Sequence, residues 1–216
     1  MSKNIFFISD THFGHANMCT FVNYDGTKAR NFNSFEEADE AMIKNWNSMV
    51  SDGDVVYVLG DVAYGCRKEY ADSILVRLKG QKKLIAGNHD LWSTQWYLKH
   101  FKYVRGCCHL DNFYLSHTPI NPSSKGRFKL NIHGHIHGER VMETRYEAVY
   151  EGYEADLRMR HTPDPFYFNV SVDYNYRYTP VPYEEIQEYY QKCLDEGLLQ
   201  PIPKKERENE RVNELQ

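Results

Sequence analysis

Two histidines stand two residues apart in the segment Gly134-His135-Ile136-His137. The segment follows a short β-like run at residues 128–133. Side chains alternate along a strand, so imidazoles at this spacing lie on the same face. Neutral imidazole is a common metal ligand. We therefore looked for other residues that could reach the same ion.

Other apolar runs of the chain also end in residues that can bind a metal or move a proton. These runs cover residues 5–9, 55–59, 82–86 and 112–116, and each is typical of a buried strand. The residues that follow them are Asp10 and His12, Asp61, Asn88 and His89, and His117. Ligands of α/β sheets bind beyond the carboxyl ends of the strands. We expect all these side chains to meet in one crevice.

The donor atoms of this set are oxygens and imidazole nitrogens, without a thiolate. Such donors suit Mn²⁺, Fe²⁺ or Zn²⁺ better than a copper site or a calcium cage. Seven candidate ligands are too many for one tetrahedral ion, but they fit two ions that share a carboxylate: Asp10, His12, Asp61, Asn88, His117, His135 and His137. Two ions about 3.5–4 Å apart stabilise both the attacking and the leaving oxygen of an in-line displacement. The chemistry that fits is hydrolysis of a phosphate ester.

Helical patterns separate the first three strands. One begins after an N-cap at Ser34 and runs to about residue 50, another covers residues 68–78, and a short one covers residues 93–100. Strands that alternate with helices predict an α/β fold. The second half contains short β-like runs and a final helix at residues 183–194. Residues 139–165 show little periodicity and are interpreted as an insertion or flap.

Composition limits the class of protein. The chain has 216 residues, 41% of them hydrophobic, and a formal net charge of -4, which gives no overall basic bias towards nucleic acid. Its five cysteines lack Cys-x-x-Cys spacing and favour reduced thiols. No apolar run approaches the roughly 20 residues of a membrane-spanning helix, and no signal-peptide pattern opens the chain. We expect a cytoplasmic protein with one domain at residues 1–200, no membrane partner, and a charged, disordered tail at residues 201–216.

The ordered motifs resemble those of the calcineurin-like metallophosphoesterase family. They are Asp10-x-His12, Gly60-Asp61, Gly87-Asn88-His89-Asp90, Ser116-His117 and Gly134-His135-x-His137. Residues 10–17 and 169–173 are similar to a small single-domain branch found in bacteria and phages. The resemblance implies a four-layer αββα sandwich, in which two mixed β-sheets pack together with helices outside. It also implies two divalent ions, Mn²⁺ first, with Fe, Zn or Ni as alternatives.

The same resemblance implies a role for each matching residue. Asp10, His12 and His137 would hold one metal, Asn88, His117 and His135 would hold the other, and Asp61 would bridge the two. The nucleophile would be a metal-bridging water or hydroxide. His89 would donate a proton to the leaving oxygen or steady the phosphate, and Asp90 is a hypothetical orienting group for His89.

One position departs from the family pattern. Many relatives carry an acid or an arginine three residues after the bridging aspartate, where this chain has Tyr64. Candidate substrate contacts are His15, Arg67, Arg127 and Arg30. A phosphodiester or cyclic nucleotide is slightly favoured as the substrate. The alternatives are a phosphomonoester of a small metabolite or phosphoprotein, a nucleic acid, and a non-catalytic scaffold with this fold. The sequence does not determine the oligomeric state.

Overall fold

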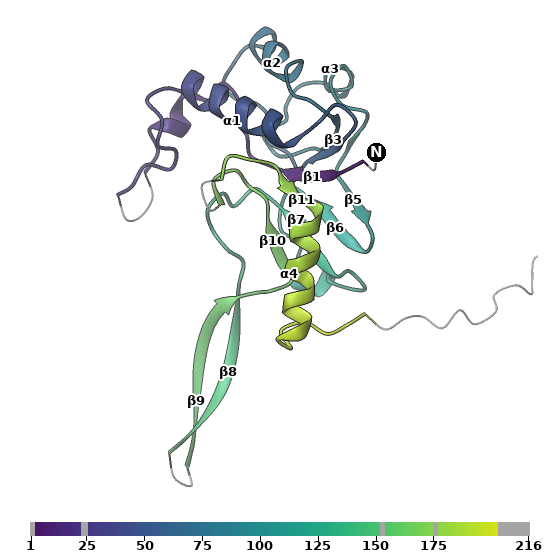
Figure 1. Ribbon diagram of the computed structural model, residues 1–216. Coiled ribbons are helices and arrows are strands. Elements are labelled where there is room, and N and C mark those ends of the chain that lie inside the picture. The colour runs from purple at the N-terminus through teal and green to yellow at the C-terminus, as the bar shows by residue number, and fades with distance from the viewer. Residues whose placement is uncertain (1–2, 23–25, 152–153, 175–176, 203–216) are drawn as a thin grey trace, which may run out of the picture.

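The computed structural model describes residues 3–22, 26–151, 154–174 and 177–202. Two mixed β-sheets form its centre (Figure 1). The first sheet has the order β11-β1-β2-β3-β4. Its strands are β11 (Val181–Pro182), β1 (Ile5–Ile8), β2 (Val55–Val58), β3 (Gln81–Ile85) and β4 (Val104–Arg105). Strands β1 to β4 are parallel, whereas β11 is antiparallel to β1.

The second sheet has the order β10-β7-β6-β5. Its strands are β10 (Tyr167–Asn169), β7 (Leu130–His133), β6 (Phe113–Ser116) and β5 (Cys107–Leu110). Neighbours are parallel from β10 to β6, and β5 is antiparallel to β6. Two mixed sheets with accompanying helices confirm the predicted fold class.

Three helices pack beside the first sheet (Figure 1). They are α1 (Phe35–Met49), α2 (Lys68–Leu75) and α3 (Thr94–Tyr97). Helix α1 begins where the Ser34 hydroxyl accepts a hydrogen bond from the Glu37 amide, as an N-cap does. Its buried residues, Met42, Ile43 and Trp46 among them, join one core with side chains of β1, β2 and β3. Burial of this apolar face fixes α1 against the sheet.

A second core joins the two sheets. Phe7 of β1 and Ile85 of β3 belong to the same buried cluster as Leu115 of β6 and Ile132 of β7. Helix α4 (Tyr183–Asp195) packs against this cluster, where the Tyr183 ring contacts both Phe7 and Phe113. The sheets are therefore held face to face, which brings loops from both together. Short 3₁₀ turns lie at Ala16–Cys19 (η1) and Pro122–Ser124 (η2).

A long antiparallel hairpin projects from the domain (Figure 1). It consists of β8 (Met142–Glu151) and β9 (Glu154–Pro163), paired from Met142 with Pro163 to Glu151 with Glu154. The sequence analysis found no period here, because charged residues stand on both strands and mask the alternation. The insertion therefore has a regular structure. The tail that the sequence predicted at residues 201–216 lies outside the described residues from residue 203 on.

In the part of the chain that the structure describes, no helix is long and apolar enough to cross a membrane.

Candidate metal centre

The candidate ligands lie in loops that leave the carboxyl ends of five strands. Asp10 and His12 follow β1, Asp61 follows β2, and Asn88 follows β3. His117 follows β6, and the pair His135 and His137 follows β7. Because the two sheets pack face to face, these loops meet. Two groups of side chains could each hold a metal ion, Asp10 with His12 and His137, and Asp10 with Asp61 and His117.

The backbone is strained at most of these positions. Eight non-glycine residues among those described have a positive φ, and five of them are candidate ligands: Asp10, His12, Asp61, His135 and His137, at +56°, +46°, +55°, +71° and +49°. This conformation costs about 1–3 kcal/mol per residue and persists where the surroundings impose it, often at functional sites. The strained backbone of these loops therefore serves to place the candidate ligand side chains and does not stabilise the fold.

Glycines before the ligands leave room for the carboxylates. A Cβ atom on Gly134 would lie 2.1 Å from Ser9 Oγ and 2.4 Å from Asp10 Oδ2. A Cβ atom on Gly87 would lie 2.2 Å from Asp61 Oδ1. All three distances are too short for non-bonded atoms. Only glycine therefore lets the neighbouring loop approach so closely at these two positions. A glycine directly before a candidate ligand, as in Gly87-Asn88 and Gly134-His135, thus has a direct packing reason.

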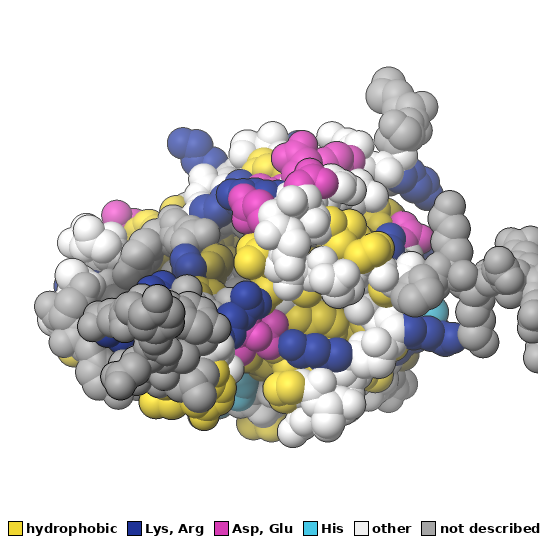
Figure 2. Space-filling model, turned by 90° about the horizontal axis from the view of Figure 1, so that it is seen from below, with side chains coloured by type: hydrophobic (Ala, Val, Ile, Leu, Met, Phe, Trp, Pro, Cys, Tyr) yellow, Lys and Arg dark blue, Asp and Glu magenta, His cyan; other side chains and the backbone are white. Residues whose placement is uncertain are grey.

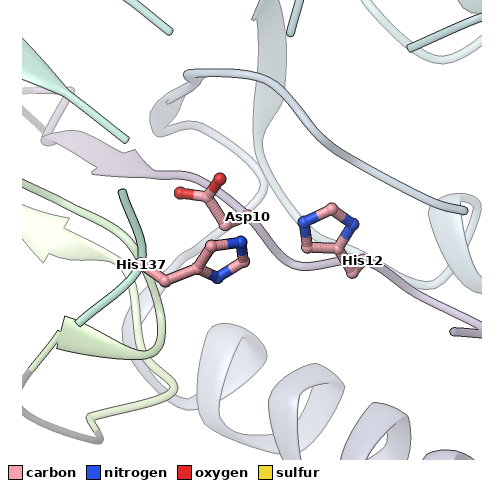
Figure 3. Close-up of side chains that lie close together, drawn as sticks. All are labelled: Asp10, His12 and His137. Atoms are coloured by element: carbon pink, nitrogen blue, oxygen red, sulfur yellow. The ribbon is translucent and has the colours of Figure 1, made fainter. Parts of the chain in front are cut away.

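The first group is formed by Asp10, His12 and His137 (Figure 3). The His12 and His137 rings are stacked, with centroids 5.3 Å apart. His12 is only 3% exposed, and neither of its ring nitrogens has a hydrogen-bond partner among the described residues. Burial, together with the charge of Arg30, lowers the pKa of His12 to about 3. A neutral, buried and unpartnered imidazole is what a metal ligand requires.

His137 is oriented by Asp173, a residue that the sequence analysis did not assign to the site. Asp173 Oδ2 lies 2.7 Å from His137 Nδ1. A carboxylate at this nitrogen favours the tautomer in which Nε2 carries the free lone pair. The sequence signal that could have pointed to Asp173 is its place at the end of the motif at residues 169–173.

Arg30 is buried and hydrogen-bonded within the protein, which contradicts its expected role as a substrate contact. Its side chain is 1% exposed. The guanidinium donates hydrogen bonds to both oxygens of Asp173, at 2.7 and 3.0 Å, and to the carbonyl oxygens of Asp10 and Thr11. Burial disfavours the charge of Asp173, but Arg30 and His137 prevail and lower its pKa to about 2. Arg30 therefore holds the loop after β1 to Asp173.

The second group is built around His117. Its Nδ1 lies 2.7 Å from the carbonyl oxygen of Leu59, which accepts a hydrogen bond and leaves Nε2 as the ligand atom. That Nε2 is 3.0 Å from Asn88 Oδ1. The His135 ring lies at 5.0 Å from the His117 ring, centroid to centroid. The three expected ligands of the second metal are therefore neighbours.

Asp61 belongs to the second group and also faces a histidine of the first. Its Oδ1 accepts a hydrogen bond from the His89 amide at 2.8 Å. Its Oδ2 is 3.6 Å from His12 Nε2 and 3.4 Å from His117 Nε2, one histidine of each expected metal. Asp10 also borders both groups, because it belongs to each set of three. The choice of bridging carboxylate between these two is a prediction that mutagenesis can test.

Asp90 acts on Asp61 rather than on His89, which corrects the expected role. Its Oδ2 accepts hydrogen bonds from the Asp61 amide at 2.9 Å and the Gly87 amide at 2.8 Å. Its Oδ1 accepts from the Val62 amide at 3.0 Å and the Tyr97 hydroxyl at 3.2 Å. The loop after β3 turns this carboxylate back to the loop after β2, so that it fixes the backbone of Asp61.

Three rings border the first group. The partly exposed His89 ring lies 5.5 Å from the His12 ring and 4.4 Å from the Tyr64 ring. Tyr64 in turn lies 4.9 Å from His15, and His15 lies 5.7 Å from His12. His89 and His15 are therefore beside the candidate metals, and Tyr64 fills the space between them. Arg67 and Arg127 are exposed, and their substrate contacts stay predictions.

The donor set fits divalent cations. Burial raises the pKa of Asp10, so that its ionised form is costly unless a cation lies nearby. The ring nitrogens of His12 have no hydrogen-bond partner among the described residues, and His117 and His137 are each held through Nδ1. These oxygen and imidazole donors match the ligands that divalent cations such as Mn²⁺ or Zn²⁺ prefer.

Comparison with known proteins decides the family. The model of the calcineurin-like phosphoesterases matches residues 3–205. The chain belongs to the calcineurin-like phosphoesterase family. Members are metal-dependent phosphoesterases as a class, and the Asp/His groups of this chain agree with that chemistry. The match includes the β8–β9 hairpin.

Similar proteins occur in archaea, phages and bacteria. An uncharacterised protein of Methanocaldococcus jannaschii is 34% identical over 142 residues, which are 65% of this chain and 73% of that protein. The Gene 66 protein of Mycobacterium phage D29 is 27% identical over 174 residues, 66% of this chain and 82% of its own length. A protein of unknown function from Aquifex aeolicus has a solved structure with a TM-score of 0.60 and 23% identity. The alignment covers 87% of this chain and 99% of that one, and it shows a shared fold.

Proposed function

We propose that this calcineurin-like phosphoesterase hydrolyses phosphate esters at a dinuclear metal centre. One observation supports the proposal: Asp61 Oδ2 lies 3.6 Å from His12 Nε2 and 3.4 Å from His117 Nε2, so that one carboxylate faces a candidate ligand of each metal. The ions would be held by Asp10, His12, Asp61, Asn88, His117, His135 and His137. Mn²⁺ is the first expectation.

When bound, two divalent ions would lower the pKa of water and stabilise negative charge on the phosphoryl oxygens. The chain itself would supply the rest. Asp90 and the Ser9 hydroxyl, which donates to Asp10 Oδ2 at 2.7 Å, hold the two carboxylates in place. His89 lies beside His12 and is partly exposed, where it can give a proton to the leaving oxygen.

A phosphodiester or cyclic nucleotide is the favoured substrate over a phosphomonoester. Alkyl phosphodiesters and cyclic nucleotides release an alkoxide, which is a poor leaving group. A proton donated by His89 would assist its departure. A nuclease has less support. On the face seen in Figure 2, Lys and Arg side chains alternate with acidic and apolar ones and form no continuous basic surface. A non-catalytic scaffold has less support still, because no candidate ligand is missing.

The test is hydrolysis by chelator-stripped protein with and without added Mn²⁺. The substrates are bis(p-nitrophenyl) phosphate and p-nitrophenyl phosphate. We expect turnover of the diester that depends on Mn²⁺. Faster turnover of the monoester would support the phosphomonoesterase alternative.

A matched pair of variants separates the site from other histidines. His12→Gln should abolish Mn²⁺-dependent turnover, whereas His109→Gln, at an exposed residue of β5, should leave it unchanged. No turnover of either ester by protein that binds two metals would contradict the proposal and favour the scaffold.

A further inference from the structure

A cavity of about 310 Å³ opens beside the candidate ligand His137. One wall consists of four apolar side chains: Met18, Phe21, Val22 and Ala29. The opposite wall includes His137 and its partner Asp173. A cavity of this size is at the lower end of the range for small-molecule sites and can hold a single ring system.

The apolar wall is held in place by backbone contacts. The Ala29 amide donates to the carbonyl oxygen of Phe21 at 2.8 Å, and Val22 forms a β-bridge with Lys28. Met18 in the η1 turn is buried, whereas Phe21 is 48% and Val22 is 66% exposed. Two large apolar side chains are thus kept at the surface of a preformed hollow, where a ligand could cover them.

The cavity borders the candidate metal centre at His137. The Phe21 ring lies 6.1 Å from the His15 ring, which lies 5.7 Å from His12. The other wall carries His137, stacked on His12. A phosphoryl group between the two groups of ligands would therefore have its substituent within reach of Phe21.

Both carboxylate oxygens of Asp173 in the cavity wall already have hydrogen-bond partners. Asp173 Oδ1 accepts from Arg30, and Asp173 Oδ2 accepts from Arg30 and pairs with His137 Nδ1. These bonds occupy both oxygens, so the wall favours contact with an apolar face over hydrogen bonds to a sugar. An aromatic ring matches best, since Phe21 can stack on it and the Met18 sulfur is a favourable neighbour.

We propose that the cavity lined by Met18, Phe21, Val22 and Ala29 binds an aromatic ring carried by the phosphate ester, such as a nucleobase or a phenyl group. The proposal rests on the proposed function, because the ring is placed by the phosphoryl group at the metals. The site therefore selects aromatic esters over small alkyl esters. Apolar side chains do not distinguish the hydrogen-bonding groups of one ring from those of another, so the site discriminates little among rings.

Binding of two hydrolysis-resistant probes to Mn²⁺-loaded protein tests the proposal. Phenylphosphonate and methylphosphonate share the phosphonate group and differ in the ring, and calorimetry gives both Kd values. We expect phenylphosphonate to bind about tenfold more tightly, from burial of part of the ring. Phe21→Ser should reduce that advantage to about twofold, by the same reasoning, and leave the methylphosphonate Kd unchanged. Because Phe21 is half exposed, this variant should fold.

The control is Val76→Ser, at a 70% exposed residue at the end of α2. It should keep the full advantage of the phenyl probe. Equal Kd values for the two probes in the wild-type protein, or an advantage that survives Phe21→Ser, would overturn the aromatic site while Mn²⁺-dependent hydrolysis still supported the proposed function. If neither probe binds and no ester is hydrolysed, the proposed function fails, and the aromatic site fails with it.

Discussion

Asp173 Oδ2 lies 2.7 Å from Nδ1 of His137, and the same carboxylate pairs with the buried guanidinium of Arg30. Arg30 also donates to the carbonyl oxygens of Asp10 and Thr11. One carboxylate therefore fixes the ring of a candidate ligand from one sheet and, through Arg30, the loop that carries two ligands from the other. Such outer contacts orient metal ligands and raise their basicity.

Replacing Asp173 should weaken metal binding more than it weakens the fold. Asp173→Asn removes the charge at His137, and we expect an affinity for Mn²⁺ that is about 10–100-fold lower. Calorimetric metal titration measures it. Asp164→Asn, which removes the partner of Lys125 away from the candidate ligands, is the control and should keep the affinity. An unchanged affinity of the Asp173 variant at a native melting temperature would contradict the orienting role.

The bridging carboxylate can be identified by counting metals. Asp61→Asn should lower the metal content at both sites, because it removes a charge shared by the two ions, whereas Asp10→Asn should chiefly empty the first. Elemental analysis of dialysed protein gives the number of ions per chain. The opposite result, with both ions lost only from the Asp10 variant, would assign the bridge to Asp10, which borders both groups.

The role of His89 predicts a dependence on the leaving group. His89→Ala should keep both metals, because the ring contacts His12 and Tyr64 but is not expected to be a ligand. Hydrolysis of esters with alkyl leaving groups should slow by about 10²–10⁴-fold, the usual contribution of a general acid. Esters of p-nitrophenol, which needs no proton, should slow much less. Equal slowing of both would argue against proton donation.

Because Gly134 lies so close to Asp10, a single added methyl group should lower both the stability and the metal affinity of the protein. Gly134→Ala would place a Cβ atom 2.1 Å from Ser9 Oγ and should lower the free energy of unfolding by about 1–3 kcal/mol. Mn²⁺ affinity should fall as well, since Asp10 must move. Gly106→Ala is matched to it, because no atom lies within 4 Å of its added Cβ. Denaturant unfolding of both variants checks the difference.

Asp39 of α1 should make stability depend on pH. Burial raises the pKa of this carboxyl to about 6 from 3.8, although the Gly14 amide and the Tyr70 hydroxyl donate to it. The native state then binds the proton more tightly than the unfolded chain. Stability should fall as pH rises from about 4 to above 6, by at most roughly 3 kcal/mol.

Asp39→Asn lacks this titration. Its free energy of unfolding should therefore change less between pH 4.5 and pH 7.5 than that of the wild type. Parallel curves for the two proteins would show that Asp39 does not titrate in this range.

Local patterns predicted an α/β fold and the candidate ligands, whereas the four-layer sandwich was implied by the family resemblance. Short apolar runs with helices between them specify parallel strands, and the carboxyl ends of parallel strands meet at one edge. Asp10, Asp61 and Asn88, which follow three strands of one sheet, could thus be expected to converge without knowledge of any contact. The glycines beside them also belong to the local pattern, since their role is to let neighbouring loops approach.

Only the tertiary structure decided which partners these residues have. Arg30 and Asp173 are 143 positions apart, and no periodicity connects them. Only the packing of the two sheets brings them together and buries an arginine that looked free to bind phosphate. Likewise, Asp90 reaches Asp61 and not its neighbour His89, because the loop after β3 folds back. The cavity beside His137 exists only where the η1 turn, the Phe21 loop and the segment after β7 meet.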